Sequence, residues 1–163
     1  MIIRAAVITV SDKGSAGQRE DKSGPEVEAL LKAIGIEVSH RTIVPDEIEQ
    51  IRNIIVDFAD HLKIDLIVTT GGTGVTPRDV TPDATLGVID KEVPGMAEAM
   101  RRESHKITPH ALISRAVAGI RGQTLILNLP GSPKGVRENL AVVLPALRHA
   151  IEKIKGDEGE CAV

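Results

Sequence analysis

Four short segments along the chain predict strands, and the first of them is an apolar run, rich in β-branched residues, that is consistent with a strand buried on both faces. They lie at residues 2–10, 37–44, 66–70 and 124–129. Between them, apolar residues return every three or four positions, as they do along the buried face of a helix. This alternation predicts an α/β fold, a three-layer sandwich with a largely parallel central sheet.

Three of the helical segments have clear boundaries in the sequence. The first begins near Ser23 and is stopped by Gly35. The second opens at Asp46 and carries an apolar stripe. The last has Ser132 as its N-cap, and its stripe continues in phase past Pro145, so we expect this proline to kink the helix without ending it.

Three more helices are expected between the third and fourth strands. Residues 82–89 follow Thr81, which fits the N-cap position, with Pro82 in the first turn. Residues 96–106 form the second of these segments, and residues 110–119, which are rich in alanine, form the third.

Composition fits one soluble domain over residues 1–155, followed by a short, frayed acidic tail at residues 156–163. Cys161 is the only cysteine, which excludes an internal disulfide and a cysteine-based zinc site. No apolar run approaches the roughly 18 residues needed to span a bilayer, and no signal-peptide layout is present. We therefore expect a cytoplasmic protein that does not bind membranes.

Charge and aromatic content argue against nucleic acid as a partner. The net charge is −3, and Phe58 is the only aromatic residue. The chain thus lacks both the global positive field and the rings on which bases stack. The five histidines show no paired spacing that would indicate a metal site.

The glycine-rich stretch after the third strand is the strongest candidate for binding. Gly71, Gly72, Thr73 and Gly74 lie between a buried strand and a helix N-terminus, an arrangement that suits phosphate binding. The stretch matches neither a Walker A sequence nor a dinucleotide fingerprint. A simple turn that reverses the chain remains the alternative.

Two aspartates could add metal chemistry to this loop. Asp79 precedes the helix, so capping does not require it; a solvated ion pair with Arg78 is the alternative. Asp46, with Glu49 three residues later, fits a capping box, which leaves structural and catalytic roles equally open. Mg²⁺ usually takes one or two carboxylates plus phosphate oxygens and waters. Asp83, in the first helical turn, is explained by the helix dipole alone.

Parallel strands would bring four loops to one edge of the sheet, where ligands bind in such folds. Arg115, in the expected helix 110–119, could reach a phosphate there, although a solvated helix face is the favoured reading. The residues that these loops contribute as candidates are Ser11, Asp12, Asp46, Gly71, Gly72, Thr73, Gly74, Asp79, Asn128, Pro130, Gly131 and Ser132.

Residues 70–74, 77–85 and 127–133 together resemble the molybdopterin adenylyltransferase family, the MogA/MoaB-type proteins of molybdenum cofactor biosynthesis. The resemblance implies the molybdopterin-binding fold and Mg²⁺-dependent transfer of AMP from ATP to the terminal phosphate of molybdopterin, with release of pyrophosphate. Asp46 and Asp79 match the essential pair of the family. Thr73 and Ser114 match positions on the molybdopterin side.

These matches lead to a hypothesis for the site. Asp46 and Asp79 would hold Mg²⁺ and orient the triphosphate, and the amides of residues 71–74 would cradle a phosphate. The family further implies a homotrimer or hexamer and a molybdenum insertion protein as a downstream partner. A MoaB-like protein that binds molybdopterin without transferring AMP is the runner-up, and a nucleotide pyrophosphate hydrolase is a third possibility. Retention of both aspartates favours the transferase.

Overall fold

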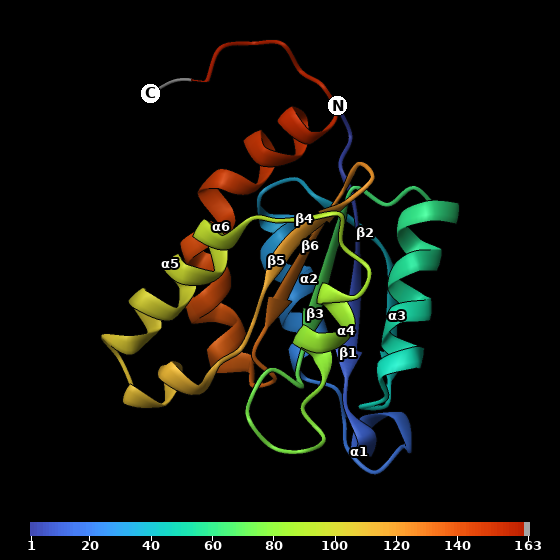
Figure 1. Cartoon of the computed structure of the whole chain (residues 1–163), viewed down its shortest axis with the longest axis vertical. Coiled ribbons are helices and arrows are strands. Elements are labelled where there is room, and N and C mark those ends of the chain that lie inside the picture. Colours follow the sequence, from blue (N-terminus) through green and yellow to red (C-terminus); the bar gives the residue numbers. More distant parts are fainter. Residues whose placement is uncertain (162–163) are drawn as a thin grey trace.

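A six-stranded sheet forms the centre of the molecule in a computed structural model that describes residues 1–161 (Figure 1). The strand order is β2-β1-β3-β6-β5-β4. The first four strands in this order are parallel, and β5 pairs antiparallel with both β6 and β4. The strands are β1 (Arg4–Val10), β2 (Glu37–Val44), β3 (Leu66–Thr70), β4 (Lys91–Glu92), β5 (Ala118–Arg121) and β6 (Thr124–Leu129).

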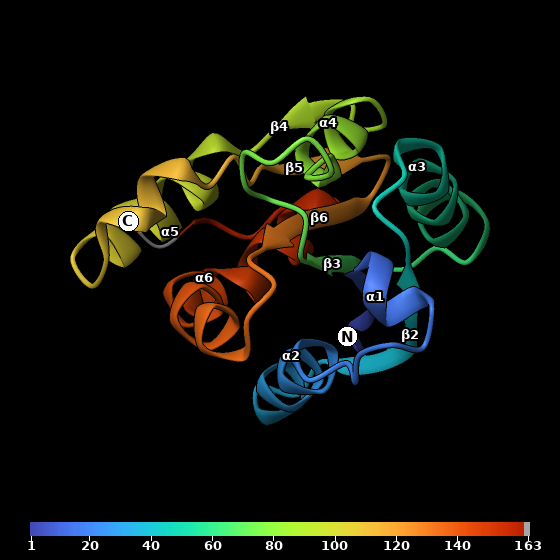
Figure 2. The same cartoon turned by 90° about the horizontal axis from the view of Figure 1, so that it is seen from below.

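Helices cover both faces of the sheet, which confirms the predicted three-layer α/β architecture (Figure 2). Side chains of α2, α5 and α6 pack on one face, and those of α3, η1 and α4 on the other. The helices are α1 (Asp12–Ser15), α2 (Ser23–Ala33), α3 (Ile48–Val56), the π-helix η1 (Asp57–His61), α4 (Thr81–Leu86), α5 (Pro94–His105), the 3-10 helix η2 (Pro109–Ile113) and α6 (Pro133–Ile154).

The central strands are apolar because both of their faces are covered. Successive side chains of a strand point to opposite faces. Val7 and Val68 pack against α2 and α6, whereas Ile8 and Ile67 pack against α3. All four are fully buried. These continuous apolar runs explain why β1, β3 and β6 were predicted with bounds close to the observed ones. The fourth parallel strand, β2, lies at the edge of the sheet and is exposed or half-buried throughout.

The expected helix over residues 110–119 is wrong. Only Pro109–Ile113 is helical, and Ala118–Arg121 is a strand that pairs antiparallel with β6. The pairing of these residues with a buried neighbour overrides the helix propensity of alanine. The two-residue strand β4, which extends this pairing, was not predicted.

Two expected helix starts also differ. Glu47, not Asp46, occupies the N-cap position of α3, and no side chain caps this helix. The capping box of Asp46 and Glu49 is therefore absent. Thr81 is the first residue of α4 rather than its cap, and its hydroxyl donates to the carbonyl of Gly71 instead (2.9 Å). Two expectations for α6 are confirmed: Ser132 caps the helix, and Pro145 lies inside it without ending it.

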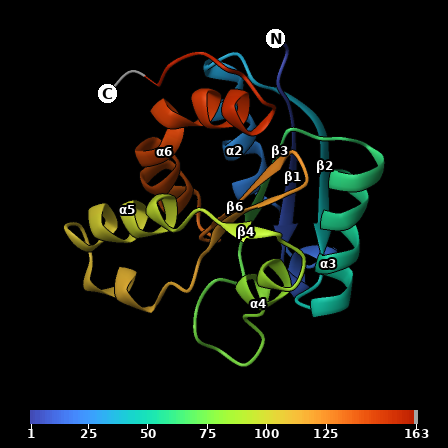
Figure 3. The same ribbon diagram turned by 45° about the horizontal axis from the view of Figure 1, so that its top comes forward.

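The loops that follow the parallel strands gather at the carboxyl edge of the sheet, at the bottom of Figure 1. The N-terminus and the end of α6 lie at the opposite edge, which Figure 3 brings forward. Residues 156–161 are exposed and form no helix or strand, and residues 162–163 lie outside the described part. Within residues 1–161, no helix combines the length and apolar character needed to cross a membrane.

Candidate active site

The carboxyl edge of the sheet is hollowed by two adjoining cavities. The larger, of about 870 Å³, is lined by loops after β1, β2, β3 and β6, so the predicted convergence of these four loops is observed. The candidate residues that line it are Ser11, Asp12, Asp46, Gly71, Gly72, Asp79, Gly131 and Ser132.

The smaller cavity, of about 400 Å³, lies beside α5, η2 and the start of α6. Thr73, Gly74, Ser114, Pro130 and Ser132 are the candidate residues in its wall. Ser132 thus borders both cavities. The glycine loop separates them, because its first two glycines line the larger cavity and its next two residues line the smaller one.

The backbone of this loop explains its glycines. Gly71 and Gly72 have φ values of +101° and +67°, a region that other residues rarely adopt. The amide of Gly71 donates to the carbonyl of Leu129 (3.0 Å), so it cannot belong to the expected phosphate cradle. Among the described residues, the amides of Gly72, Thr73 and Gly74 have no intramolecular acceptor. These three N–H groups remain available to an anion.

Asp12 and Asp46 bind each other's main chain and so join the ends of β1 and β2. The amide of Asp12 donates to Oδ2 of Asp46 (2.9 Å), and the amide of Asp46 donates to Oδ1 of Asp12 (3.0 Å). Burial raises the pKa of the Asp46 carboxyl, and the negative charges of Asp12 and Asp79 add to this effect, while the amide of Asp12 opposes it. Asp46 therefore lies in a site that favours an added positive charge.

Arg78 connects the glycine-rich loop to the same pair of strand ends. Its guanidinium donates to both carboxylate oxygens of Asp12 (3.0 and 2.9 Å) and to Glu47 (3.0 Å). These hydrogen bonds lower the pKa of Asp12. The pairing of Arg78 with Asp79, considered from the sequence, is absent from the described residues. Asp79 is left without a charged partner.

The carboxylates of Asp46 and Asp79 suit a magnesium ion that also binds substrate. Oδ2 of Asp79 accepts from the amide and hydroxyl of Thr76 (3.0 and 2.8 Å). In the described part of the chain, Oδ1 of Asp79 and Oδ1 of Asp46 accept no hydrogen bond. No cluster of three or more potential metal ligands occurs within residues 1–161. Two carboxylates, each with one free oxygen, fit the ligand set of Mg²⁺ with phosphate and water.

Asn128 lies apart from both cavities. It is fully buried, and its amide nitrogen donates to the hydroxyls of Thr69 (2.9 Å) and Thr85 (3.1 Å). Its oxygen accepts from the amide of Val117 (3.2 Å). Asn128 therefore links β6 to β3, α4 and the segment before β5 from inside the core, without reaching either cavity wall.

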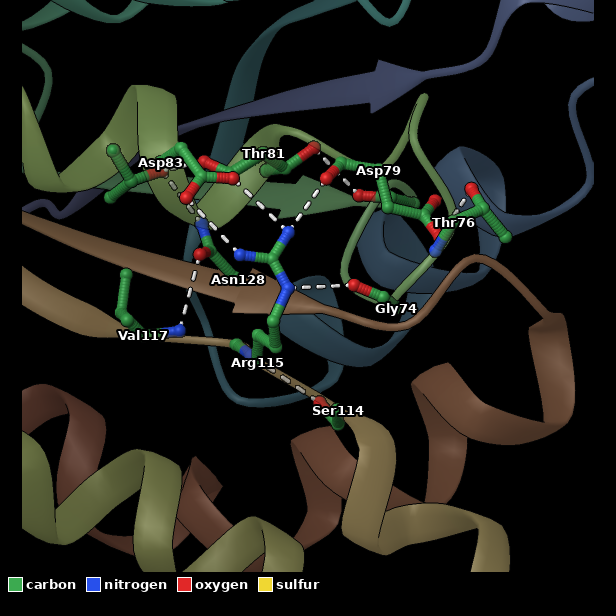
Figure 4. A network of polar contacts seen from close by, with 12 residues as sticks. Gly74, Thr76, Asp79, Thr81, Asp83, Ser114, Arg115, Val117 and Asn128 are labelled. Carbon is green, nitrogen blue, oxygen red and sulfur yellow. Dashed lines mark hydrogen bonds and ion pairs between the residues drawn. The ribbon is translucent and has the colours of Figure 1, made fainter.

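Arg115 makes an ion pair at the carboxyl edge that the sequence did not indicate. It lies outside any helix, so the reading as a solvated helix face is wrong. Its guanidinium pairs with Asp83 (3.1 Å) and lowers the pKa of that carboxyl (Figure 4). This ion pair, in addition to the helix dipole, accounts for a structural role of Asp83.

Several polar residues of the cavity walls were missed. The larger cavity is bordered by the rest of the polar segment after β1, and its position directly after a parallel strand was a usable signal. The smaller cavity takes its other residues from α5, η2 and the start of α6. Because α6 follows the parallel strand β6, its residues carried the same signal, whereas those of α5 and η2 did not. The missed polar residues are Thr9, Lys13, Arg19, Glu20, Asp21, Lys22 and Ser23 in the first cavity, and Arg101, Ser104, Thr108, His110, Lys134, Glu138 and Asn139 in the second.

Relatives of known name share this chain's sequence over most of its length. It is 42% identical over 157 residues to the molybdopterin adenylyltransferase of Helicobacter pylori strain J99, covering 95% of this chain and 89% of the relative. It is 43% identical to the molybdopterin adenylyltransferase of Escherichia coli strain K12, covering 88% of this chain and 75% of the relative. A gephyrin of Dictyostelium discoideum is 49% identical over 156 residues, but the chain spans only 21% of its length.

Solved structures and a family model agree with these relatives. A molybdopterin biosynthesis enzyme MoaB from Thermus thermophilus superposes with a TM-score of 0.91 at 49% identity, covering 96% of this chain and 98% of that chain. A molybdopterin biosynthesis Mog protein from Mycobacterium ulcerans superposes with a TM-score of 0.89 at 36% identity, covering 96% of this chain and 99% of that chain. The model described as a probable molybdopterin binding domain matches residues 6–149. The chain therefore belongs to the molybdopterin-binding domain family, which includes the molybdopterin adenylyltransferases.

Proposed function

We propose that this protein is a molybdopterin adenylyltransferase, which transfers AMP from ATP to the terminal phosphate of molybdopterin and releases pyrophosphate. The observation that carries the proposal is the pair of cavities, separated by a glycine loop with free amides and joined at Ser132. Two substrates bound in adjoining cavities would meet at the loop. The identity of 42–43% to proteins named molybdopterin adenylyltransferase supports the same reaction.

The larger cavity is the proposed site for ATP and Mg²⁺. It holds the two carboxylates with free oxygens, Asp46 and Asp79, and it is lined by the cations Lys13, Arg19 and Lys22. When bound there, Mg²⁺ would neutralise phosphate charge and so lower the electrostatic barrier to attack. Asp46 and Asp79 are the residues that would hold it.

The smaller cavity is the proposed site for molybdopterin. Thr73 and Ser114, the positions that match the molybdopterin side of the family, both line it. Arg101 and Lys134 in its wall could pair with the terminal phosphate, while Ile107 and Ile113 offer apolar contact to the pterin.

In the proposed reaction, an oxygen of the molybdopterin phosphate attacks the α-phosphorus of ATP. The new P–O bond forms as the bond to the β-phosphate oxygen breaks, and the electron pair leaves with pyrophosphate. The amides of Gly72, Thr73 and Gly74 would stabilise charge on the reacting phosphates. The fixed loop supplies orientation, which removes much of the entropic cost of bringing two polyanions together.

The test of the proposal is to mix the protein with ATP, Mg²⁺ and molybdopterin and to measure adenylylated molybdopterin and pyrophosphate. We expect both products in equal amounts, and neither without Mg²⁺. Binding of molybdopterin without either product would support the MoaB-like binding protein instead. Release of pyrophosphate from ATP without molybdopterin would indicate a hydrolase.

We further propose that the product passes to a molybdenum insertion protein, because adenylylated molybdopterin must be consumed by a reaction that inserts the metal. Gephyrin, of which this chain matches one fifth, is a longer protein. A pull-down with an insertion protein, in the presence and absence of the adenylylated product, would test this partner.

A further inference from the structure

Arg115 joins three segments of the site, and protein acceptors occupy most of its guanidinium. Nε donates to the carbonyl of Gly74 (2.8 Å), and Nη2 donates to the carbonyl of Asp79 (2.6 Å). Nη1 and Nη2 each donate to the carboxylate of Asp83 (3.1 Å) (Figure 4). Four of the five guanidinium N–H groups are thus directed at the protein, which argues against the expected reach to a phosphate.

The acceptors of Arg115 lie at both ends of one loop, residues 74–79. Its main-chain amide also binds the carbonyl of Thr73 (2.8 Å). One residue therefore holds the start of the loop, through Thr73 and Gly74, and its end, through Asp79. The start borders the smaller cavity and the end borders the larger one.

The loop has few other supports on this side. Val75 is 61% exposed, and Thr76 and Asp79 bind mainly each other. On the far side, Arg78 reaches Asp12 and Glu47, but its side chain is 55% exposed. Exposed ion pairs contribute little to order, because water and salt screen the two charges. Arg115 is less exposed, at 38%, and binds main-chain carbonyls that fix the path of the backbone.

We propose that Arg115 is a positioning residue, which holds the loop of residues 74–79 so that Asp79 faces the larger cavity while Thr73 and Gly74 face the smaller one. Its effect on catalysis rests on the proposed function; its effect on the loop does not. A misplacement of about 1 Å in such a site can cost about 100-fold in rate.

The geometry explains why an arginine is needed. Its planar fork donates in three directions at once, and the carboxylate of Asp83 fixes the orientation of that fork. A lysine at this position keeps the charge but has a single nitrogen, so it cannot bridge Gly74, Asp79 and Asp83 together. Arg115→Lys is therefore the sharper variant, because it separates geometry from charge.

Arg121 provides a matched control at the opposite edge of the sheet. It donates to both oxygens of Asp60 (2.9 and 2.7 Å) and to the carbonyl of Val88 (2.7 Å). This is the same kind of arrangement, a bidentate carboxylate plus a carbonyl, but it lies beside Thr124 at the start of β6. Arg121→Lys should cost similar stability without touching the loop.

The first measurement is hydrogen exchange of the ligand-free protein. In Arg115→Lys, we expect the amides of Thr76 and Asp79 to exchange at least about tenfold faster, because both are protected only within the loop. Arg121→Lys should leave these two amides unchanged. Equal exchange in the wild type and Arg115→Lys would overturn the proposal. If Arg115→Lys fails to fold, Asp83→Asn, which releases the fork, gives the same comparison.

The second measurement is the Mg²⁺ dependence of AMP transfer. We expect Arg115→Lys to need at least about fivefold more Mg²⁺ for half-maximal rate, with part of kcat recovered at saturating Mg²⁺, while Arg121→Lys behaves as the wild type. Faster loop exchange with unchanged Mg²⁺ dependence and kcat would overturn the role in catalysis. A wild type without transfer activity contradicts the proposed function, and exchange alone then decides whether Arg115 holds the loop.

Discussion

Gly72 shows how tightly single residues are constrained at the carboxyl edge. Its φ of +67° is strained for any side chain, and a Cβ there would overlap the Thr81 hydroxyl and lie 3.0 Å from Oδ1 of Asp46. The absent side chain therefore leaves room for a free carboxylate oxygen. The position of the Asp46 carboxylate therefore depends on the absence of a side chain at Gly72.

Gly72→Ala should impair transfer by at least about tenfold, because the methyl group displaces Asp46 and Thr81. Gly122→Ala is the control: it has the same left-handed backbone (φ +56°) with nothing within 4 Å of the added atom. Both variants should lose about 1–2 kcal/mol to strain. Comparison of melting temperature and kcat/KM separates the two effects; equal activity in the two variants would contradict the assignment.

Asp79→Asn should reduce kcat/KM for AMP transfer by about 100-fold or more, since loss of one metal-binding carboxylate removes several kcal/mol of charge stabilisation. The fold should persist, because the asparagine oxygen can still accept from Thr76. Pyrophosphate release is the measurement, and Asp57→Asn on η1 is a control outside both cavities. Near-normal release from Asp79→Asn would rule out the metal role.

At the scale of elements, the sequence predicted what burial controls and missed what tertiary pairing controls. β1, β3 and β6 follow from continuous apolar runs, β2 follows from a segment with several β-branched residues that closes on Pro45, and α6 follows from its stripe and its Ser132 cap. β5 and β4 do not, since a short strand beside β6 carries no pattern of its own.

The site was predicted in the same uneven way. Asp79 could be identified because no helix cap required it, and the glycine loop because of its place between strand and helix. Asp46 stayed ambiguous, because a capping box and a cavity carboxylate look alike in sequence; only the reciprocal bonds with Asp12 exclude the cap. The hydrogen bonds of the Arg115 guanidinium could not be predicted, because its acceptors lie 32–41 positions away in the sequence.

The contact between β5 and η1 predicts a pH effect on stability. Hydrogen bonds from Arg121 lower the pKa of Asp60 below its ordinary value of about 3.9. The stabilisation is therefore complete above that value and is lost as the pH falls through the lowered pKa. Asp60→Asn should reduce the free energy of unfolding by up to about 1 kcal/mol at pH 7, because the pair is partly exposed.

Urea unfolding of the wild type and Asp60→Asn at several pH values between 3 and 7 measures this effect. The difference between the two proteins should shrink below about pH 4 and approach zero at the acid end. A difference that is the same at pH 3 and pH 7 would show that the carboxylate charge of Asp60 does not contribute.

At the scale of the molecule, three exposed apolar side chains lie at the smaller cavity: Ile107 and Ile113 line its wall, and Leu112 lies outside it. Ile107, Leu112 and Ile113 are 57%, 67% and 52% exposed in the segment that joins α5 to β5. Neighbouring exposed apolar side chains of this size often mark a surface that another protein covers. We propose that a second copy of this chain covers Leu112, which lines neither cavity, in line with the trimer or hexamer expected from the family.

Light scattering should then give a mass of three or six times 17.4 kDa at micromolar concentration. Leu112→Asp should lower that mass, because a carboxylate is costly to bury in an apolar contact. A wild type that stays at 17.4 kDa would contradict the expected oligomer. An unchanged mass in Leu112→Asp would show that Leu112 is not part of the interface.

The cavities and the N-terminus lie at opposite edges of the sheet, which has a practical consequence for fusing this protein to another unit. Both cavities lie at the carboxyl edge, whereas Met1 and the end of α6 at Ile154 lie at the other edge (Figures 1 and 3). A linker, a surface anchor or a second catalytic unit joined at Met1 or directly after α6 would leave both cavities open to solvent. Such a fusion could hand its product directly to a neighbour on the same chain.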